Sequence, residues 1–125
     1  MILDTNGLLA MADGDSKLEP VLRQATGIAI PVIVLGEYKY GFRQSRHKAK
    51  YERWLAAVVA DCRILALDES TAEEYARIRS ELRLAGRPIP ANDLWIAALA
   101  RQHSLKLVSR DIHFDGISGL QRVGW

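Results

Sequence analysis

The sequence predicts an α/β protein in which a mostly parallel β-sheet is flanked by helices in three layers, as a single domain over residues 1–125. Short apolar or β-type segments alternate along the chain with longer helical segments, and this alternation is typical of a parallel sheet with helical crossovers. With 125 residues, of which 49% are hydrophobic and 26% charged, the chain has the size and composition of one globular domain.

Five short segments have the composition of strands: residues 1–3, 28–30, 63–67, 106–108 and 120–123. The first four are apolar enough to be buried, and the last is predicted to lie at an edge of the sheet. Helical segments fill the intervals: residues 7–12, 16–25, 31–41, 46–60, 70–84 and 92–103. The helix that begins near residue 92 is apolar almost all round, so it is predicted to be buried.

Boundary residues support these helices. Ser16 is the predicted N-cap of the second helix, whose first turn contains Pro20. Gly41 is expected to interrupt the helix that Pro31 begins.

In the second half of the chain, Ser70 and Glu73 have the spacing of a capping box, which predicts a helix that continues to about residue 84. Residues 86–90 are predicted to form a loop. Asn92, or the residue before it, is the predicted cap of the buried helix. Residues 109–116 are predicted to form a loop or a single turn.

Composition also limits the class of protein. No apolar run approaches the ~20 residues that a membrane span needs, and no signal-type segment precedes Asp4, so we expect a cytoplasmic protein without membrane contact. Cys62 is the only cysteine, which rules out an internal disulfide and is consistent with a reducing compartment. The net charge of +2 does not by itself require a nucleic acid partner.

Four acidic residues lie in unusually apolar surroundings. Asp4 follows the first strand, Glu37 lies within an apolar helical stretch, Asp93 is in the first turn of the buried helix, and Asp111 follows the strand at 106–108. A buried charge is costly unless it is paired or bound to metal, and no basic neighbour is placed to pair with each of these. Because Asp4 and Asp111 both follow parallel strands, they are expected at one edge of the sheet. Such oxygen-rich clusters suit Mg²⁺ or Mn²⁺.

These residues lie in short motifs: Asp-Thr-Asn at 4–6, Gly-Glu at 36–37, Asn-Asp-Leu-Trp-Ile-Ala at 92–97, and Ser-Arg-Asp with His-Phe-Asp at 109–115. In this order and spacing they resemble the PIN-domain ribonucleases, and most of all the VapC toxins of bacterial toxin–antitoxin pairs. The resemblance covers nearly the whole chain. It assigns the family's catalytic and metal-binding acids to Asp4, Glu37, Asp93 and Asp111.

Further positions match the family less uniformly. Asp115 matches a fifth acidic position that varies among such proteins. Thr5, Asn6 and Ser109 match polar positions that would hydrogen-bond a metal-bound water or a carboxylate, although each also fits a turn or a helix cap. Gly7 stands where many relatives have an aliphatic residue, and we expect this difference to affect packing.

The resemblance implies a Mg²⁺-dependent endoribonuclease, with Mn²⁺ as a possible substitute, that leaves a 3′-hydroxyl and a 5′-phosphate. It also implies a small cognate antitoxin, a homodimer and an RNA substrate. In this family the helices after the first two strands often form the antitoxin groove.

Three other functions compete with the toxin ribonuclease. A phosphatase with Asp4 as nucleophile, of the haloacid-dehalogenase type, would need a second aspartate at the position of Asn6. A housekeeping PIN nuclease of RNA maturation remains open, although a single domain without an additional RNA-binding module favours a toxin. A non-catalytic interaction domain is disfavoured because all four acids are present.

Basic and aromatic residues gather near the third and fourth helices. Six basic residues lie here: Arg43, Arg46, His47, Lys48, Lys50 and Arg53. They form either a contact surface for the RNA backbone or a solvated helix face. By the family resemblance, the antitoxin groove would use the same region. Tyr38, Tyr40 and Phe42 are assigned to packing rather than to base stacking. The three histidines are too scattered for a zinc site. His113 is near Asp111 and could touch substrate, but a structural or exposed role is favoured.

Overall fold

The computed structural model describes residues 1–125 and is built around a five-stranded sheet in which every neighbouring pair of strands is parallel. The strands lie in the order β3-β2-β1-β4-β5. Their bounds are β1 (Ile2–Leu3), β2 (Ala29–Pro31), β3 (Arg63–Leu65), β4 (Leu107–Val108) and β5 (Arg122–Val123). The predicted parallel sheet is therefore confirmed, including the edge position of the last strand.

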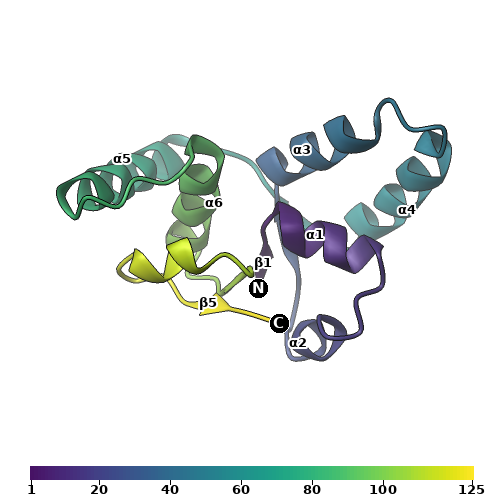
Figure 1. The fold of residues 1–125 in the computed structure, drawn as a ribbon, viewed down its shortest axis with the longest axis horizontal. Helices are drawn as coiled ribbons and strands as arrows, with labels where there is room; N and C mark the ends of the chain where they lie inside the picture. Colours follow the sequence, from purple (N-terminus) through teal and green to yellow (C-terminus); the bar gives the residue numbers. More distant parts are fainter.

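Helices flank the sheet in two groups, so the predicted α/β architecture is confirmed (Figure 1). Helices α5 and α6 lie to the left of β1 in this view, and α1, α3 and α4 lie to its right. The helices are α1 (Thr5–Ala12), α2 (Glu19–Arg23), α3 (Val32–Phe42), α4 (Lys48–Asp61), α5 (Glu69–Leu84), α6 (Ala91–Gln102) and the 3₁₀ helix η1 (Ile112–Gly116). None of the helices has the length and apolar character needed to cross a membrane.

The core forms where the two central strands meet the apolar helix α6. Both residues of β1 and both residues of β4 are fully buried, and Leu3 pairs with Val108 across the two strands. Helix α6 buries six of its twelve residues, which confirms that its nearly continuous apolar sequence belongs to the interior. This arrangement fixes the two chain segments that follow β1 and β4 side by side.

The order of the strands places a topological switch point between β1 and β4. From β1 the chain passes to β2 and β3 on one side, and then returns to β4 on the other side of β1. Ligands of open parallel sheets bind outside the carboxyl ends of the strands at such a point. Asp4 and Asp111 follow the two strands that flank it.

Helix α5 begins two residues earlier than the sequence predicts. Its N-cap is Asp68, whose carboxylate accepts a hydrogen bond from the backbone N–H of Thr71 at 3.0 Å, while the Thr71 hydroxyl accepts one from the backbone N–H of Asp68 at 3.0 Å. The predicted Ser70–Glu73 capping box is wrong, because Asp68 lies upstream of Ser70 and makes Ser70 part of the first turn. The Thr71 hydroxyl is fully buried and also donates to Gln102 of α6 at 2.5 Å.

Three smaller predictions about helix ends also fail. Helix α2 has Leu18 as N-cap and no side-chain cap, so Ser16 does not begin it. Helix α3 continues through Gly41 to Phe42, because a single glycine costs a helix only about 1 kcal/mol. The N-cap of α6 is Pro90, which leaves the side chain of Asn92 free for another partner.

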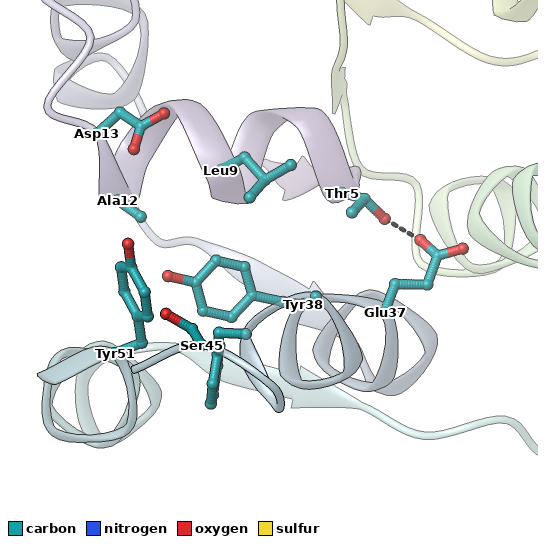
Figure 2. A pocket seen from close by; sticks show the side chains of 10 residues that line it. Thr5, Leu9, Ala12, Asp13, Glu37, Tyr38, Ser45 and Tyr51 are labelled. Atoms are coloured by element: carbon teal, nitrogen blue, oxygen red, sulfur yellow. Dashed lines mark hydrogen bonds between the residues drawn. The ribbon is translucent and has the colours of Figure 1, made fainter. Parts of the chain in front are cut away.

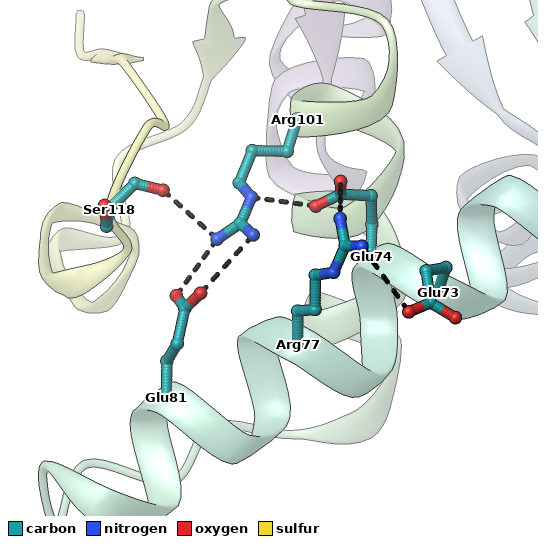
Figure 3. A network of polar contacts seen from close by, with 6 residues as sticks. All are labelled: Glu73, Glu74, Arg77, Glu81, Arg101 and Ser118. Atoms are coloured by element: carbon teal, nitrogen blue, oxygen red, sulfur yellow. Dashed lines mark hydrogen bonds and ion pairs between the residues drawn. The ribbon is translucent and has the colours of Figure 1, made fainter.

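A network centred on Arg101 ties α6 to α5 and to the segment after η1 (Figure 3). The Arg101 guanidinium donates to Glu74 at 2.9 Å and to Glu81 at 3.0 Å, both on α5. It also donates to the backbone carbonyl of Ser118 at 3.2 Å. The Arg101 side chain is only 15% exposed, so these bonds are partly shielded from water and hold three segments together.

Replacing Thr71 by valine should lower the free energy of unfolding by about 1–2 kcal/mol, because the shape is kept but the buried hydroxyl and its bonds to Asp68 and Gln102 are lost. Urea denaturation followed by circular dichroism measures the change. Ser70→Ala is the matched control, and it should change the stability by less than about 0.5 kcal/mol because Ser70 is exposed and caps nothing. A larger loss in Ser70→Ala than in Thr71→Val would contradict the observed cap.

Candidate metal centre at the carboxyl edge of the sheet

Asp4 is a buried carboxylate at the end of the central strand. It is the N-cap of α1, and its Oδ1 accepts a hydrogen bond from the backbone N–H of Gly7 at 2.7 Å. Only 4% of the residue is exposed. Burial raises the pKa of Asp4, and the hydrogen bonds from Ser109 and Gly7 lower it in part. Asp4 is therefore held in place by the protein but is costly to ionise.

Gly7 matters because it lies against this carboxylate. A Cβ at this position would lie 3.3 Å from both Asp4 Oδ1 and the carbonyl oxygen of Val108. These contacts are tight, so the absence of a side chain lets α1 begin directly against the strand ends. In this chain, Gly7 therefore serves the packing around Asp4.

Asp93, Asp111 and His113 form a compact group beside Asp4. One ligand atom from each residue can be chosen so that all three atoms lie within 4.8 Å of one another, and all three residues are half-buried. Asp111 is the N-cap of η1, and its Oδ1 accepts hydrogen bonds from the backbone N–H of His113 at 3.1 Å. The backbone N–H of Asp111 itself donates to the Ser109 hydroxyl at 3.0 Å.

Glu37 is held by two hydrogen bonds from other elements. The Thr5 hydroxyl of α1 donates to Glu37 Oε2, and the side-chain amide of Asn92 on α6 donates to Oε1 at 2.6 Å. Both oxygens of Glu37 therefore have a donor, and the side chain is oriented from two sides. The Thr5 contact appears in Figure 2 at one end of a groove.

The other three acids all lie close enough to Asp93 to affect its pKa. Burial is the largest cause that raises the pKa of Asp93, proximity to His113 lowers it, and the charges of Asp111, Asp4 and Glu37 raise it further. No lysine or arginine forms an ion pair with any of these four carboxylates. Oxygen donors with an excess of negative charge and no fixed basic partner fit a divalent cation.

Two predicted residues are not brought into this group. Both oxygens of Asp115 accept from Arg122, at 2.8 and 2.9 Å, and this hydrogen-bonded ion pair lowers the pKa of Asp115. Asn6 is exposed in the first turn of α1 and makes no side-chain hydrogen bond. Thr5 and Ser109, in contrast, contact the carboxylates as expected.

Two residues of the site were missed from the sequence. Asn92 was treated as a helix cap, although it directly precedes Asp93 and reaches Glu37 across 55 residues of chain. For His113 the sequence favours a structural or exposed role over a contact with substrate, and the structure places its ring against both Asp93 and Asp111. The spacing of His113 from Asp111 was a usable signal, whereas the partner of Asn92 was not visible locally.

A groove of about 290 Å³ opens beside the site between α1, α3 and the start of α4 (Figure 2). Thr5 and Glu37 lie at the end of the groove next to the carboxylates, while Leu9 of α1, Tyr38 of α3 and Tyr51 of α4 line its apolar part. Leu9 is 43% exposed, which is high for a leucine next to the core. The groove lies between the helices that follow the first two strands.

Two of the three aromatic residues predicted to pack, Tyr38 and Phe42, do lie in the core. Tyr38 and Phe42 are buried, and their ring centroids lie 5.3 Å apart in an edge-on arrangement. Tyr40 is instead 82% exposed, so the packing assignment is wrong for this residue. It points away because it lies two residues from Tyr38, on the other face of α3.

The fold and the site define an α/β protein with a carboxylate-rich, metal-type centre at a topological switch point. The sequence matches the PIN domain family over residues 1–120. The chain belongs to this family, whose members are metal-dependent nucleases, so the phosphatase alternative is dropped.

Relatives and solved structures agree with this assignment. The chain is 31% identical over 124 residues to ribonuclease VapC5 of Mycobacterium tuberculosis, covering 98% of this chain and 90% of the relative. The structure of VapBC2 from Rickettsia felis bound to a promoter DNA fragment has a TM-score of 0.88 and 29% identity, covering 99% of this chain and 97% of the other. The structure of FitAcB from Neisseria gonorrhoeae has a TM-score of 0.85 and 28% identity, covering 98% and 96%.

Asp4→Asn should raise the thermal stability of the metal-free protein at neutral pH, because asparagine keeps the oxygen that caps α1 and removes a charge that burial disfavours. The pKa of Asp4 is higher in the folded protein than in the unfolded chain. As pH rises above about 4, the unfolded chain therefore releases this proton more readily than the folded protein does, and the stability of the unmutated protein falls. The gain of Asp4→Asn should therefore vanish near pH 3.5.

Thermal melts in EDTA across this pH range measure the gain. Asp4→Ala is the control for the cap, and it should be less stable than Asp4→Asn at every pH because it lacks the acceptor for Gly7. A variant Asp4→Asn that is less stable than the unmutated protein at pH 7 would show that the charge of Asp4 is favourable in the fold.

Proposed function

We propose that this protein is a metal-dependent endoribonuclease that acts as the toxin of a VapBC-type toxin–antitoxin pair. The observation that carries the proposal is the convergence of Asp4, Glu37, Asp93 and Asp111 without a lysine or arginine partner, in a chain of the PIN family. The relatives named as VapC ribonucleases and the structures of VapBC and FitAB complexes support the toxin assignment.

Asp93 and Asp111 are the proposed principal ligands of a Mg²⁺ ion, for which Mn²⁺ can substitute, and Asp4 and Glu37 complete the negative site. A cation held by these residues would polarise the scissile phosphate and lower the pKa of a bound water molecule, which would favour hydrolysis. Thr5 and Asn92 hold the Glu37 carboxylate in one orientation, and the hydrogen bonds from Gly7 and Ser109 do the same for Asp4. The carboxylates of Asp4 and Glu37 are therefore already oriented before the RNA binds.

The RNA would approach over the edge of the sheet that carries these acids. A set of exposed basic residues at the turn between α3 and α4 and at the start of α4 is available for backbone phosphates: Arg43, Arg46, Lys48, Lys50 and Arg53. A homodimer is proposed as the working form, since two copies would present two acidic sites to one RNA.

The groove between α1 and α3 is the proposed seat of the antitoxin. Its apolar part, with the exposed Leu9, suits an apolar segment of a partner protein, and its polar end reaches Thr5 and Glu37. A partner in this groove would lie against the catalytic carboxylates, so binding and inhibition would occur at the same place.

RNA cleavage should fall by roughly 10²–10³-fold in each of Asp4→Asn, Glu37→Gln, Asp93→Asn and Asp111→Asn, because each change removes a charge needed to stabilise the transition state. EDTA should abolish cleavage by the unmutated protein. Purified variants are assayed on single-stranded RNA with Mg²⁺ or Mn²⁺.

Two controls separate the site from general effects of charge. Glu19→Gln on the exposed surface of α2 should cleave like the unmutated protein. Asp115→Asn should lose much less activity than the four variants, since its carboxylate is already bound to Arg122. Undiminished cleavage in EDTA would refute the metal mechanism.

Expression of the protein in a bacterial host should arrest growth, and expression of Asp4→Asn to the same soluble level should not. Co-expression with the small protein encoded beside it in its native operon should restore growth, and the two proteins should co-purify. If neither the unmutated protein nor Asp4→Asn slows growth, although both are expressed in soluble form, a housekeeping PIN nuclease is favoured instead.

A further inference from the structure

The His113 imidazole lies between two carboxylates of the site. Its Nδ1 is 2.9 Å from Asp111 Oδ1, and its Nε2 is 3.3 Å from Asp93 Oδ2. The Nε2 atom is shielded from solvent and has no hydrogen-bond partner, because its contact with Asp93 lacks hydrogen-bond geometry. It is the only buried side-chain nitrogen or oxygen in the chain without a hydrogen bond. A buried polar atom in this state requires an explanation.

The contacts of the ring indicate which nitrogen is available. The Nδ1 atom lies 2.9 Å from Asp111 Oδ1 and is the ring nitrogen nearer to a carboxylate, so we assign the proton of the neutral imidazole to Nδ1 and the lone pair to Nε2. This lone pair faces the side of the ring where Asp93 lies. The lone pair of Nε2 and the carboxylate oxygen Oδ2 of Asp93 repel each other at 3.3 Å, and a cation between or beside them would make this placement favourable.

We propose that Nε2 of His113 is a nitrogen ligand of the divalent cation held by Asp93 and Asp111. The inference rests on the proposed metal-dependent function and deepens it. One ligand atom each from Asp93, Asp111 and His113 can be chosen so that all three lie within 4.8 Å of one another, and Nε2 itself is 3.3 Å from Asp93 Oδ2; opposite ligands of an ion at ~2.2 Å are ~4.4 Å apart. The close contact of Nδ1 with Asp111 then orients the ring, as carboxylates do for metal-binding histidines.

A nitrogen ligand changes which ion the site prefers. Mg²⁺ strongly prefers oxygen ligands, whereas first-row transition ions gain affinity from imidazole. With His113 as a ligand, the site should favour Mn²⁺ over Mg²⁺ more strongly than a site of carboxylates alone. His113 is thus a determinant of metal selectivity in this protein.

The opposing account treats His113 as a positively charged counter-ion that neutralises Asp93 and Asp111 when no metal is bound. A cation entering the site would then have to displace or deprotonate the imidazolium. Removing His113 would leave metal binding unchanged or make it tighter. The two accounts therefore predict opposite signs for the same substitution.

His113→Asn is the appropriate variant, because an asparagine amide can donate near the position of Nδ1 but has no atom at the position of Nε2. Titration of free Mn²⁺ by electron paramagnetic resonance gives the Mn²⁺ affinity, and displacement of Mn²⁺ by Mg²⁺ gives the Mg²⁺ affinity. We expect the Kd for Mn²⁺ to rise by about 10-fold or more and the Kd for Mg²⁺ to change by less than about threefold.

A spectroscopic readout tests the bond itself. Electron spin echo modulation of bound Mn²⁺ should show coupling to an imidazole ¹⁴N in the unmutated protein and none in His113→Asn. His103→Asn is the matched control, since His103 follows the far end of α6, ten residues or about 15 Å from Asp93. It should bind Mn²⁺ normally and keep the ¹⁴N signal.

Absence of ¹⁴N coupling in the unmutated protein with Mn²⁺ bound overturns the inference, whether or not His113→Asn folds. Unchanged or tighter Mn²⁺ binding by a folded His113→Asn overturns it as well and favours the counter-ion account. Failure of the proposed function has a different signature: bound Mn²⁺ with ¹⁴N coupling, but no cleavage of RNA. In that case the nitrogen ligand stands and the nuclease assignment falls.

Discussion

The parallel pairing of β1 with β4 is the constraint on which the rest of the site depends. The two strands are only two residues long each and are fully buried, and their register places Leu3 opposite Val108. The residues that follow them, Asp4 and Ser109, must therefore emerge together at one edge of the sheet. The backbone N–H of Asp4 continues the ladder toward the carbonyl of Val108, at 3.4 Å. A shift of one residue in this register would separate the carboxylates.

This constraint forces like charges together, and the surrounding structure offsets part of the cost. Asp4 lies at the N-terminus of α1, where the backbone amide of Gly7 and the helix dipole favour a negative charge. Asp93 lies in the first turn of α6, where the same effect applies. Burial nevertheless raises the pKa of both carboxyl groups, so the site keeps an electrostatic strain that a cation would relieve.

The C-terminal segment that carries Asp111 and His113 is held by two arginines. Arg101 connects α5 and α6 to the carbonyl of Ser118, beyond η1. Arg122 on β5 binds Asp115 with two hydrogen bonds and also donates to the carbonyl of Ser109 at 3.0 Å. Asp115 thereby ties η1 to β5, so its carboxylate serves the fold.

Local patterns in the sequence determined the alternation of strands and helices and the burial of α6, and they singled out the four acids as candidates. Each depends on neighbouring residues: apolar runs, residue types at helix starts, and an acid directly after a strand. The convergence of Asp4 with Asp111 also followed from sequence, because parallel strands present their carboxyl ends at a common edge.

The partners of individual polar groups were decided only by the tertiary structure. Asn92 binds Glu37, Thr71 binds Gln102, and Asp115 binds Arg122, although each of these residues has a plausible local or metal-binding role in the sequence. The place of His113 between Asp93 and Asp111 also depends on how η1 folds back toward α6. Hydrogen bonds between side chains are short and directional, so they depend on where distant segments pack, and no local pattern encodes that placement.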